Sequence, residues 1–147
     1  MIRVKYPFLP HRPLTAKEIR LIPESFFFLL RARLAVSFQS SAAYLPRPSS
    51  EAGVPVITAP MMEAAKTIAG VIEGLSRRTP WNSTCLVRTL AAYNMLVRRN
   101  IPCMIHLGVY KNTLPGQLGA HAWLSVGEQV LVGGGRLERY SEIARLG

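Results

Sequence analysis

The feature that most constrains this chain is a cysteine placed where a polar loop turns into an apolar helix. Residues 80–90 read PWNSTCLVRTL, and Cys85 directly follows Ser83 and Thr84, whose hydroxyl groups can cap a helix. A thiol in the first helical turn lies near unpaired backbone N–H groups and the positive end of the helix dipole, which favour the thiolate. The pattern indicates a cysteine nucleophile; the alternative is a packed core thiol, the commonest fate of a free cysteine.

A cysteine nucleophile needs a base, and the histidines of the chain compete for that role. His121 lies in an expected strand whose alternation places it on the same face as Trp123. His106, on the preceding expected strand, is the competing base, and His11 in the N-terminal arm is the weakest candidate. Cys85 and His121 are far apart in sequence, so their contact must be a tertiary one. Together they predict a cysteine peptidase or another acyl-transfer enzyme.

Composition argues against several other classes. The hydrophobic fraction is 49% and the mean hydropathy is +0.18, yet no apolar run is long enough to span a membrane, and the N-terminus lacks the apolar core of a signal peptide. Cys85 and Cys103 are too few for a disulfide framework, and Cys103 is expected to be a packed thiol. With three histidines at unrelated spacings and no aspartate, we expect no metal site and no cofactor. The expected location is the cytoplasm, with both thiols reduced.

The formal net charge of +10 indicates a surface that attracts acidic partners. The arginines are spread along the chain, with no basic tail and no aromatic–glycine repeat of the RNA-binding kind. We therefore expect no nucleic-acid partner. A non-catalytic basic module that binds a peptide, a protein or nucleic acid remains an alternative function.

Hydrophobic periodicity predicts an α+β fold with helices first and an antiparallel sheet after them. A helical stripe starts at Thr15, and Pro23 is expected to break it. Phe26 to Phe28 cannot all face one core, so at least one of them should contact another segment, a partner protein or a membrane surface. Residues 39–60 are expected to form a linker without a persistent helix. The next helix, Met61–Leu75, has Met62, Ala65, Ile68, Ala69 and Ile72 on one side and Glu63, Lys66 and Glu73 on the other.

The second half of the chain carries the expected central helix and the sheet. The helix from Thr84 to Arg99 is apolar around much of its girth and should be the buried one, with Asn100 as its C-terminal cap. The remaining elements are, in order, a strand at 103–110, a polar loop at 111–119, strands at 121–126 and 129–132 joined by a tight turn, a stop at 133–135 and a short helix at 140–146. We expect a helical extension with its linker over residues 1–58 and a catalytic core over residues 59–147.

Five groups of residues together resemble the transglutaminase-like cysteine proteases that mature lasso peptides. They are Pro80-Trp81, Ser83-Thr84-Cys85-Leu86-Val87-Arg88, Arg98-Arg99-Asn100-Ile101-Pro102, His106-Leu107-Gly108-Val109 and Ala120-His121-Ala122-Trp123-Leu124. Their order, spacing and identity agree with that family over about residues 60–147, and the preceding helix is similar to its N-terminal extension.

The resemblance implies a papain-like, transglutaminase-like core in which a Cys-bearing helix packs on an antiparallel sheet that carries His. It implies that Cys85 is the nucleophile and His121 the base, in an enzyme that cuts the leader from a ribosomally made precursor peptide. Partners would be that precursor, a separate leader-recognition protein and an ATP-dependent cyclase that closes the macrolactam ring. The oxyanion would be held by the Cys85 backbone N–H with Trp81 Nε1 or Asn82, and Trp123 would line the substrate site.

The chain departs from the family at the third catalytic position. In that family an acidic residue usually lies on the strand after the histidine, whereas this chain has no aspartate and has Gly127, Gly133 and Gly134 at the places where that acid is expected. Glu128 is the nearest acid and the candidate third member, although it can equally be a solvated turn residue. A backbone carbonyl, Ser125, Gln129 or a partner chain could orient the imidazole instead. A transglutaminase or amidase, which resolves the thioester with another nucleophile, is the closest alternative function.

Overall fold

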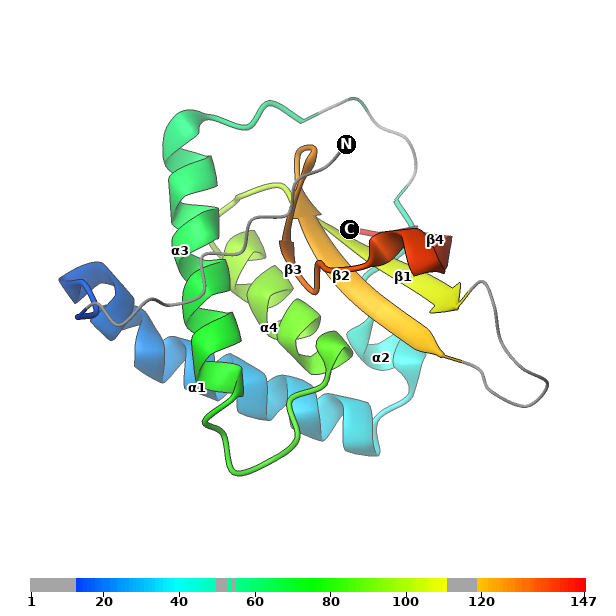
Figure 1. The fold of residues 1–147 in the computed structure, drawn as a ribbon, viewed down its shortest axis with the longest axis horizontal. Coiled ribbons are helices and arrows are strands. Elements are labelled where there is room, and N and C mark those ends of the chain that lie inside the picture. Colours follow the sequence, from blue (N-terminus) through cyan, green and yellow to red (C-terminus); the bar gives the residue numbers. More distant parts are fainter. Residues whose placement is uncertain (1–12, 50–52, 54, 111–118) are drawn as a thin grey trace.

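The computed structural model describes residues 13–49, 53, 55–110 and 119–147, with helices packed on one side of an antiparallel sheet (Figure 1). The elements are α1 (Ala16–Phe38), α2 (Ser41–Tyr44), α3 (Ala59–Ser76), α4 (Cys85–Val97), β1 (Met104–Tyr110), β2 (Ala120–Val126), β3 (Gln129–Val132), the 3-10 helix η1 (Leu137–Arg139) and β4 (Tyr140–Leu146). The predicted α+β class is confirmed. His11, the rest of the expected arm up to residue 12, and residues 111–118 of the expected polar loop lie outside the described residues.

Helix α4 is the central helix, as its apolar girth predicted. It contacts α1, α3 and β2, and its Leu90, Met95 and Leu96 side chains are almost completely buried. Burial of each such side chain contributes about 1.5–3 kcal/mol. The Thr84 hydroxyl accepts a hydrogen bond from the Val87 N–H and so caps the helix one residue before the cysteine. The C-terminal cap of α4 is Arg98 and not the predicted Asn100; Asn100 follows two residues later at φ +53°, and its N–H and that of Ile101 donate to the Val97 and Leu96 carbonyls.

Helix α1 is continuous, so the predicted break at Pro23 is wrong. A proline inside a helix removes one backbone hydrogen bond and costs roughly 3 kcal/mol. Residues beyond Pro23, namely Phe28, Leu29 and Ala32, are buried in the same core as α4, and their burial offsets this cost. The helix begins in a capping box between Thr15 and Glu18.

The three consecutive phenylalanines of α1 have three different surroundings. Phe28 is buried in the core, while the Phe26 ring lies edge-on to Trp81, with 5.1 Å between ring centroids. Phe27 remains 56% exposed. The prediction that at least one of them contacts another segment is confirmed, and Phe26 thereby ties α1 to the loop that precedes Cys85. None of the helices in the described ranges has the length and apolar content needed to cross a membrane.

The sheet has the strand order β3-β2-β1-β4, and all neighbouring strands are antiparallel. Strand β2 pairs with β1 in the register His106↔Trp123 and Gly108↔His121. Leu124 and Val126 of β2 belong to the core that the helices cover, whereas His121 and Trp123, which alternate with them, stack on each other. The predicted alternation of β2 is therefore confirmed. Strand β3 pairs with β2 only along Leu124–Val126, so the start of β2 borders α4 directly, and there the Thr89 hydroxyl donates to the Ala122 carbonyl. The tight turn after β2 and the strand Gln129–Val132 are also as predicted.

The predicted helix at 140–146 is wrong: Tyr140–Leu146 is strand β4, paired with the outer edge of β1. Its glutamate, alanine, arginine and leucine favour a helix in isolation. The unpaired backbone groups of β1 override this local preference, because the strand satisfies them and a helix could not. Ala144 and Leu146, two residues apart, then pack on the core, while Ile143 is exposed.

The expected linker is more structured than predicted. It contains the one-turn helix α2, and Pro48 forms a β-bridge with Leu146. Around it, the Ser49 N–H donates to the Arg145 carbonyl and the Gly147 N–H donates to the Arg47 carbonyl. Residues 47–49 of the linker therefore lie along the end of β4. The boundary between residues 58 and 59 stays a prediction, since α1 shares the core of the following segment.

Candidate active site

Cys85 is the first residue of α4, and its thiol lies close enough to the His121 imidazole for each group to shift the pKa of the other. Cys85 begins α4 and His121 lies on β2, and the packing of α4 against β2 brings the two residues together. A nucleophile–base pair requires such a tertiary contact, and the catalytic roles of Cys85 and His121 stay predictions. The Thr84 cap sets the helix start, and so it sets the position of the sulfur at the helix N-terminus.

The surroundings of Cys85 favour the thiolate. Burial by itself would raise the pKa of the Cys85 thiol, but hydrogen bonds from His121 and from the backbone of Ala122 and Leu86, with the charge of His121, outweigh it. The net pKa lies below the usual value of a cysteine. Cys103 is different, because burial raises the pKa of its thiol to about 12. The prediction that Cys103 is a packed thiol agrees with this.

The surroundings of His121 raise its pKa and determine which of its two ring nitrogens carries the proton. The pKa of His121 is raised above its usual value. The largest cause is the hydrogen bond with Cys85, and the hydrogen bond to the Gly133 carbonyl and the charge of Cys85 act in the same direction. Burial and the positive charge of Arg88 lower the pKa, but they do not outweigh these contributions. His121 Nε2 lies 2.5 Å from the Gly133 oxygen. Because a carbonyl can only accept, Nε2 carries the proton, and Nδ1 is the nitrogen left for the sulfur.

Aromatic rings fix the plane of the His121 imidazole. Its ring stacks with Tyr140, at 4.9 Å between centroids, and with Trp123, at 6.0 Å. Trp123 in turn stacks on His106. Gly108 makes room for this arrangement, since a Cβ there would lie 2.8 Å from the Trp123 ring.

The competing base, His106, belongs to a separate cluster. Its Nδ1 lies 2.9 Å from Glu142 and its Nε2 lies 2.8 Å from the Ser125 hydroxyl. Glu142 also accepts a hydrogen bond from Arg145. Both ring nitrogens of His106 therefore already have hydrogen-bond partners, which leaves His121 as the candidate base for Cys85.

The candidate third member, Glu128, lies in the turn at the opposite end of β2 from His121, with an exposed side chain. At about 3.3 Å per residue, the strand separates the two by far more than a hydrogen bond. Ser125 is bonded to His106, and Gln129 is exposed at the start of β3. The described residue that accepts a hydrogen bond from the imidazole is Gly133, through its backbone, which is one of the alternatives that the sequence left open.

Of the other predicted site residues, Trp123 has a described contact with His121, whereas Trp81 and Asn82 have none with Cys85 or His121. Trp123 contacts the His121 ring, as described above. Trp81 packs against Phe26, and within the described ranges its Nε1 is buried without a hydrogen-bond partner. Asn82 is exposed. No cluster of three or more His, Cys, Asp or Glu side chains in the described part of the chain could hold a metal ion.

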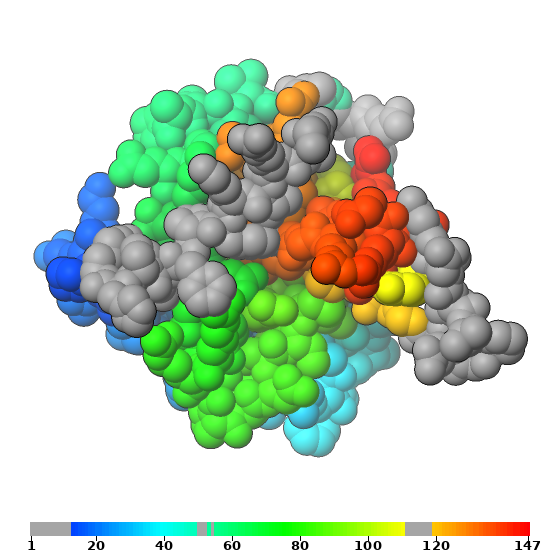
Figure 2. Space-filling view, viewed as in Figure 1, coloured from blue at the N-terminus to red at the C-terminus, as the bar shows by residue number. Residues whose placement is uncertain are grey.

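Glu73 and Arg88 also belong to the site, although sequence reasoning gave neither of them a role there. Glu73 of α3 lies 2.7 Å from Arg88 Nη1 through one carboxylate oxygen, and the other oxygen accepts a hydrogen bond from the Gly133 N–H at 3.3 Å. A sequence signal was present, because Arg88 lies one turn after the cysteine and needs a counter-charge. In the space-filling view, the orange atoms that follow β3 lie against the green atoms of α3 and α4 (Figure 2).

The two thiols should differ sharply in reactivity with iodoacetamide. Alkylation requires the thiolate, so the rate rises with pH through the pKa of each thiol. At about pH 7.5 we expect labelling of Cys85 and little labelling of Cys103, because the pKa of Cys85 is lowered and that of Cys103 is raised. His121→Ala should move the Cys85 rise to higher pH, since it removes the hydrogen bond and charge that stabilise the thiolate. Peptide mass spectrometry measures both sites in one sample; equal rates at Cys85 and Cys103 would contradict the assignment.

The comparisons with known proteins show a family for this chain. A family model described as transglutaminase-like superfamily matches residues 28–145, a range that starts in α1, ends in β4 and includes Cys85, His121 and Gly133. The searches of curated proteins and of solved structures gave no match. Proteins of this superfamily are usually cysteine-dependent enzymes. Since the match covers most of the chain, this protein belongs to the transglutaminase-like superfamily.

Proposed function

We propose that this protein is a cysteine peptidase that removes the leader from a ribosomally synthesised lasso precursor peptide. The observation that carries the proposal is the proximity of Cys85, at the start of α4, to His121, whose other ring nitrogen is bonded to the Gly133 carbonyl. The motifs around these two residues resemble lasso leader peptidases, and this resemblance narrows the substrate within the superfamily.

The geometry supports a two-step acyl transfer. The Cys85 thiolate attacks the scissile carbonyl, and the resulting oxyanion is stabilised by the Cys85 backbone N–H, which has no partner within the helix. The protonated His121 then donates its Nδ1 proton to the leaving amine. The core peptide leaves with a free amino group, and the leader remains as a thioester on Cys85. His121 finally takes a proton from water, which hydrolyses the thioester and restores the thiol.

The proposed partners follow from this reaction. A separate leader-recognition protein would deliver the precursor, and an ATP-dependent cyclase would join the new amino group of the core peptide to an acidic side chain. The proposed location is the cytoplasm, where ATP is available and both thiols remain reduced.

The test is to incubate the protein with a lasso precursor peptide and a leader-recognition protein and to follow the peptide by mass spectrometry. Hydrolysis gives two fragments whose masses sum to the precursor plus one water, and this is the expected result. A product in which an amine has replaced water would instead assign a transglutaminase or amidase activity. An unchanged precursor under conditions where Cys85 is reactive with iodoacetamide would overturn the leader-peptidase assignment.

A further inference from the structure

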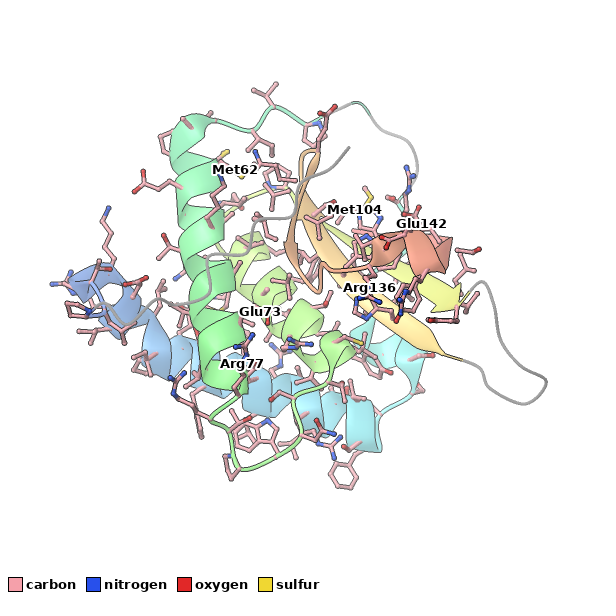
Figure 3. The ribbon with its side chains drawn as sticks, viewed as in Figure 1. Met62, Glu73, Arg77, Met104, Arg136 and Glu142 are labelled. Carbon is pink, nitrogen blue, oxygen red and sulfur yellow. The ribbon has the colours of Figure 1, made fainter. Side chains whose placement is uncertain are left out.

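The carboxylate of Glu73 lies at a junction between the nucleophile helix and the residue that orients His121. The predicted placement of Glu73 on the outer side of its helix is wrong, since its side chain is only 17% exposed and points toward α4. Figure 3 shows it on the inner side of α3. Its two oxygens contact Arg88 Nη1 at 2.7 Å and the Gly133 N–H at 3.3 Å.

Gly133 connects this carboxylate to the imidazole. Its N–H donates to Glu73, and its carbonyl accepts from His121 Nε2 at 2.5 Å. Gly133 has φ +71°, and a Cβ at this position would lie 2.4 Å from the Ala122 oxygen, so the backbone fits here only without a side chain. A displacement of Gly133 would therefore move the acceptor that keeps the His121 proton on Nε2.

Arg88 gives Glu73 a second role, which is electrostatic. Arg88 lies one helical turn after Cys85, and its positive charge lowers the pKa of His121. The ion pair with Glu73 is partly buried, with side-chain exposures of 25% and 17%, so solvent screens it less than a surface pair. Glu73 therefore offsets a charge that works against the protonated imidazole.

We propose that Glu73 is a positioning residue for the Cys85–His121 pair, acting through the Gly133 backbone and through neutralisation of Arg88. The inference rests on the proposed function for its effect on peptide cleavage, but its effect on the imidazole does not depend on the substrate.

The experiment is the titration of His121 by ¹⁵N NMR on the full chain, with the His121 signals assigned from a His121→Gln variant. The ring nitrogen shifts report both the pKa and which nitrogen carries the proton in the neutral form. The charged or titratable groups that face the ring are Cys85, Arg88 and Tyr140. Glu73→Gln is compared with Glu63→Gln, a matched control on the same helix that removes the same charge from an exposed site contacting Lys17.

Glu73→Gln is expected to lower the pKa of His121, because the Arg88 charge is no longer offset, and to reduce the fraction of neutral imidazole protonated on Nε2. Glu63→Gln should change neither. Glu73→Asp keeps the charge and should restore most of the His121 pKa. Where cleavage can be followed, Glu73→Gln should lower kcat about tenfold or more with a smaller change in KM, the size of effect seen when a histidine loses its supporting partner.

An unchanged His121 titration and tautomer in Glu73→Gln would overturn the proposal. If Glu73→Gln fails to fold, the test uses Arg88→Gln, which keeps the Glu73 carboxylate and removes the positive charge. The pKa of His121 should then rise, and an unchanged pKa would overturn the proposal. The two proposals also fail separately. A shifted His121 titration with no cleavage by the wild-type protein counts against the peptidase function alone, whereas normal cleavage with no shift counts against Glu73 alone.

Discussion

Cys85→Ala is expected to abolish cleavage of the precursor peptide, lowering kcat by a factor on the order of a thousand or more. The substitution removes the sulfur that forms the acyl-enzyme, and no other described thiol can replace it, because burial raises the pKa of Cys103 to about 12. His121→Ala should have a comparable effect, since the thiol then loses its base and the leaving amine loses its proton donor. Product masses over time measure both variants.

The matched control is Cys103→Ala, which removes the second thiol at the edge of the core. It should retain activity in proportion to its folded fraction, measured by circular dichroism. Cys85→Ala should keep the wild-type fold, because the Cys85 side chain is only partly buried. Cleavage that persists in folded Cys85→Ala or His121→Ala would remove that residue from the mechanism.

Gly133→Ala is expected to damage both stability and activity. An alanine at φ +71° costs about 1–2 kcal/mol, and its Cβ would lie 2.4 Å from the Ala122 carbonyl, so the backbone must shift. That shift moves the oxygen that accepts the His121 proton, and kcat should fall by roughly tenfold or more in the fraction that remains folded. Urea unfolding and the cleavage rate measure the two effects.

Gly70→Ala is the control, because it makes the same chemical change inside α3. A Cβ at Gly70 would meet no neighbour within 4 Å, and alanine is the better helix former, so this variant should gain about 0.5–1 kcal/mol and keep full activity. If Gly133→Ala behaved like Gly70→Ala, Gly133 would not be the residue that orients His121.

The pair at the centre of the site could be predicted because its signals are local. Ser83, Thr84 and the apolar residues after Cys85 specify a helix start, and alternation specifies the face of His121. The α+β class followed in the same way from the change of period between the first and second halves of the chain. The resemblance already favoured His121 over His106, and the structure adds that both ring nitrogens of His106 are bonded to other side chains, Glu142 and Ser125.

The features that sequence reasoning missed depend on tertiary contacts. Strand β4 has the composition of a helix and is extended because the edge of β1 is unpaired without it. Pro23 remains helical because the core buries the residues that follow it. Glu73 reads as a surface residue by helical period, and its inward position becomes understandable only when Arg88 and Gly133 lie next to it.

The most direct measurement is to trap the acyl-enzyme. The wild-type protein is mixed with precursor peptide and leader-recognition protein, quenched in acid within the first turnover, and digested for mass spectrometry. We expect a leader fragment joined as a thioester to the peptide that contains Cys85, with a mass equal to the sum of the two minus one water. Leader release without an adduct on Cys85, or an adduct on Cys103 instead, would contradict the account.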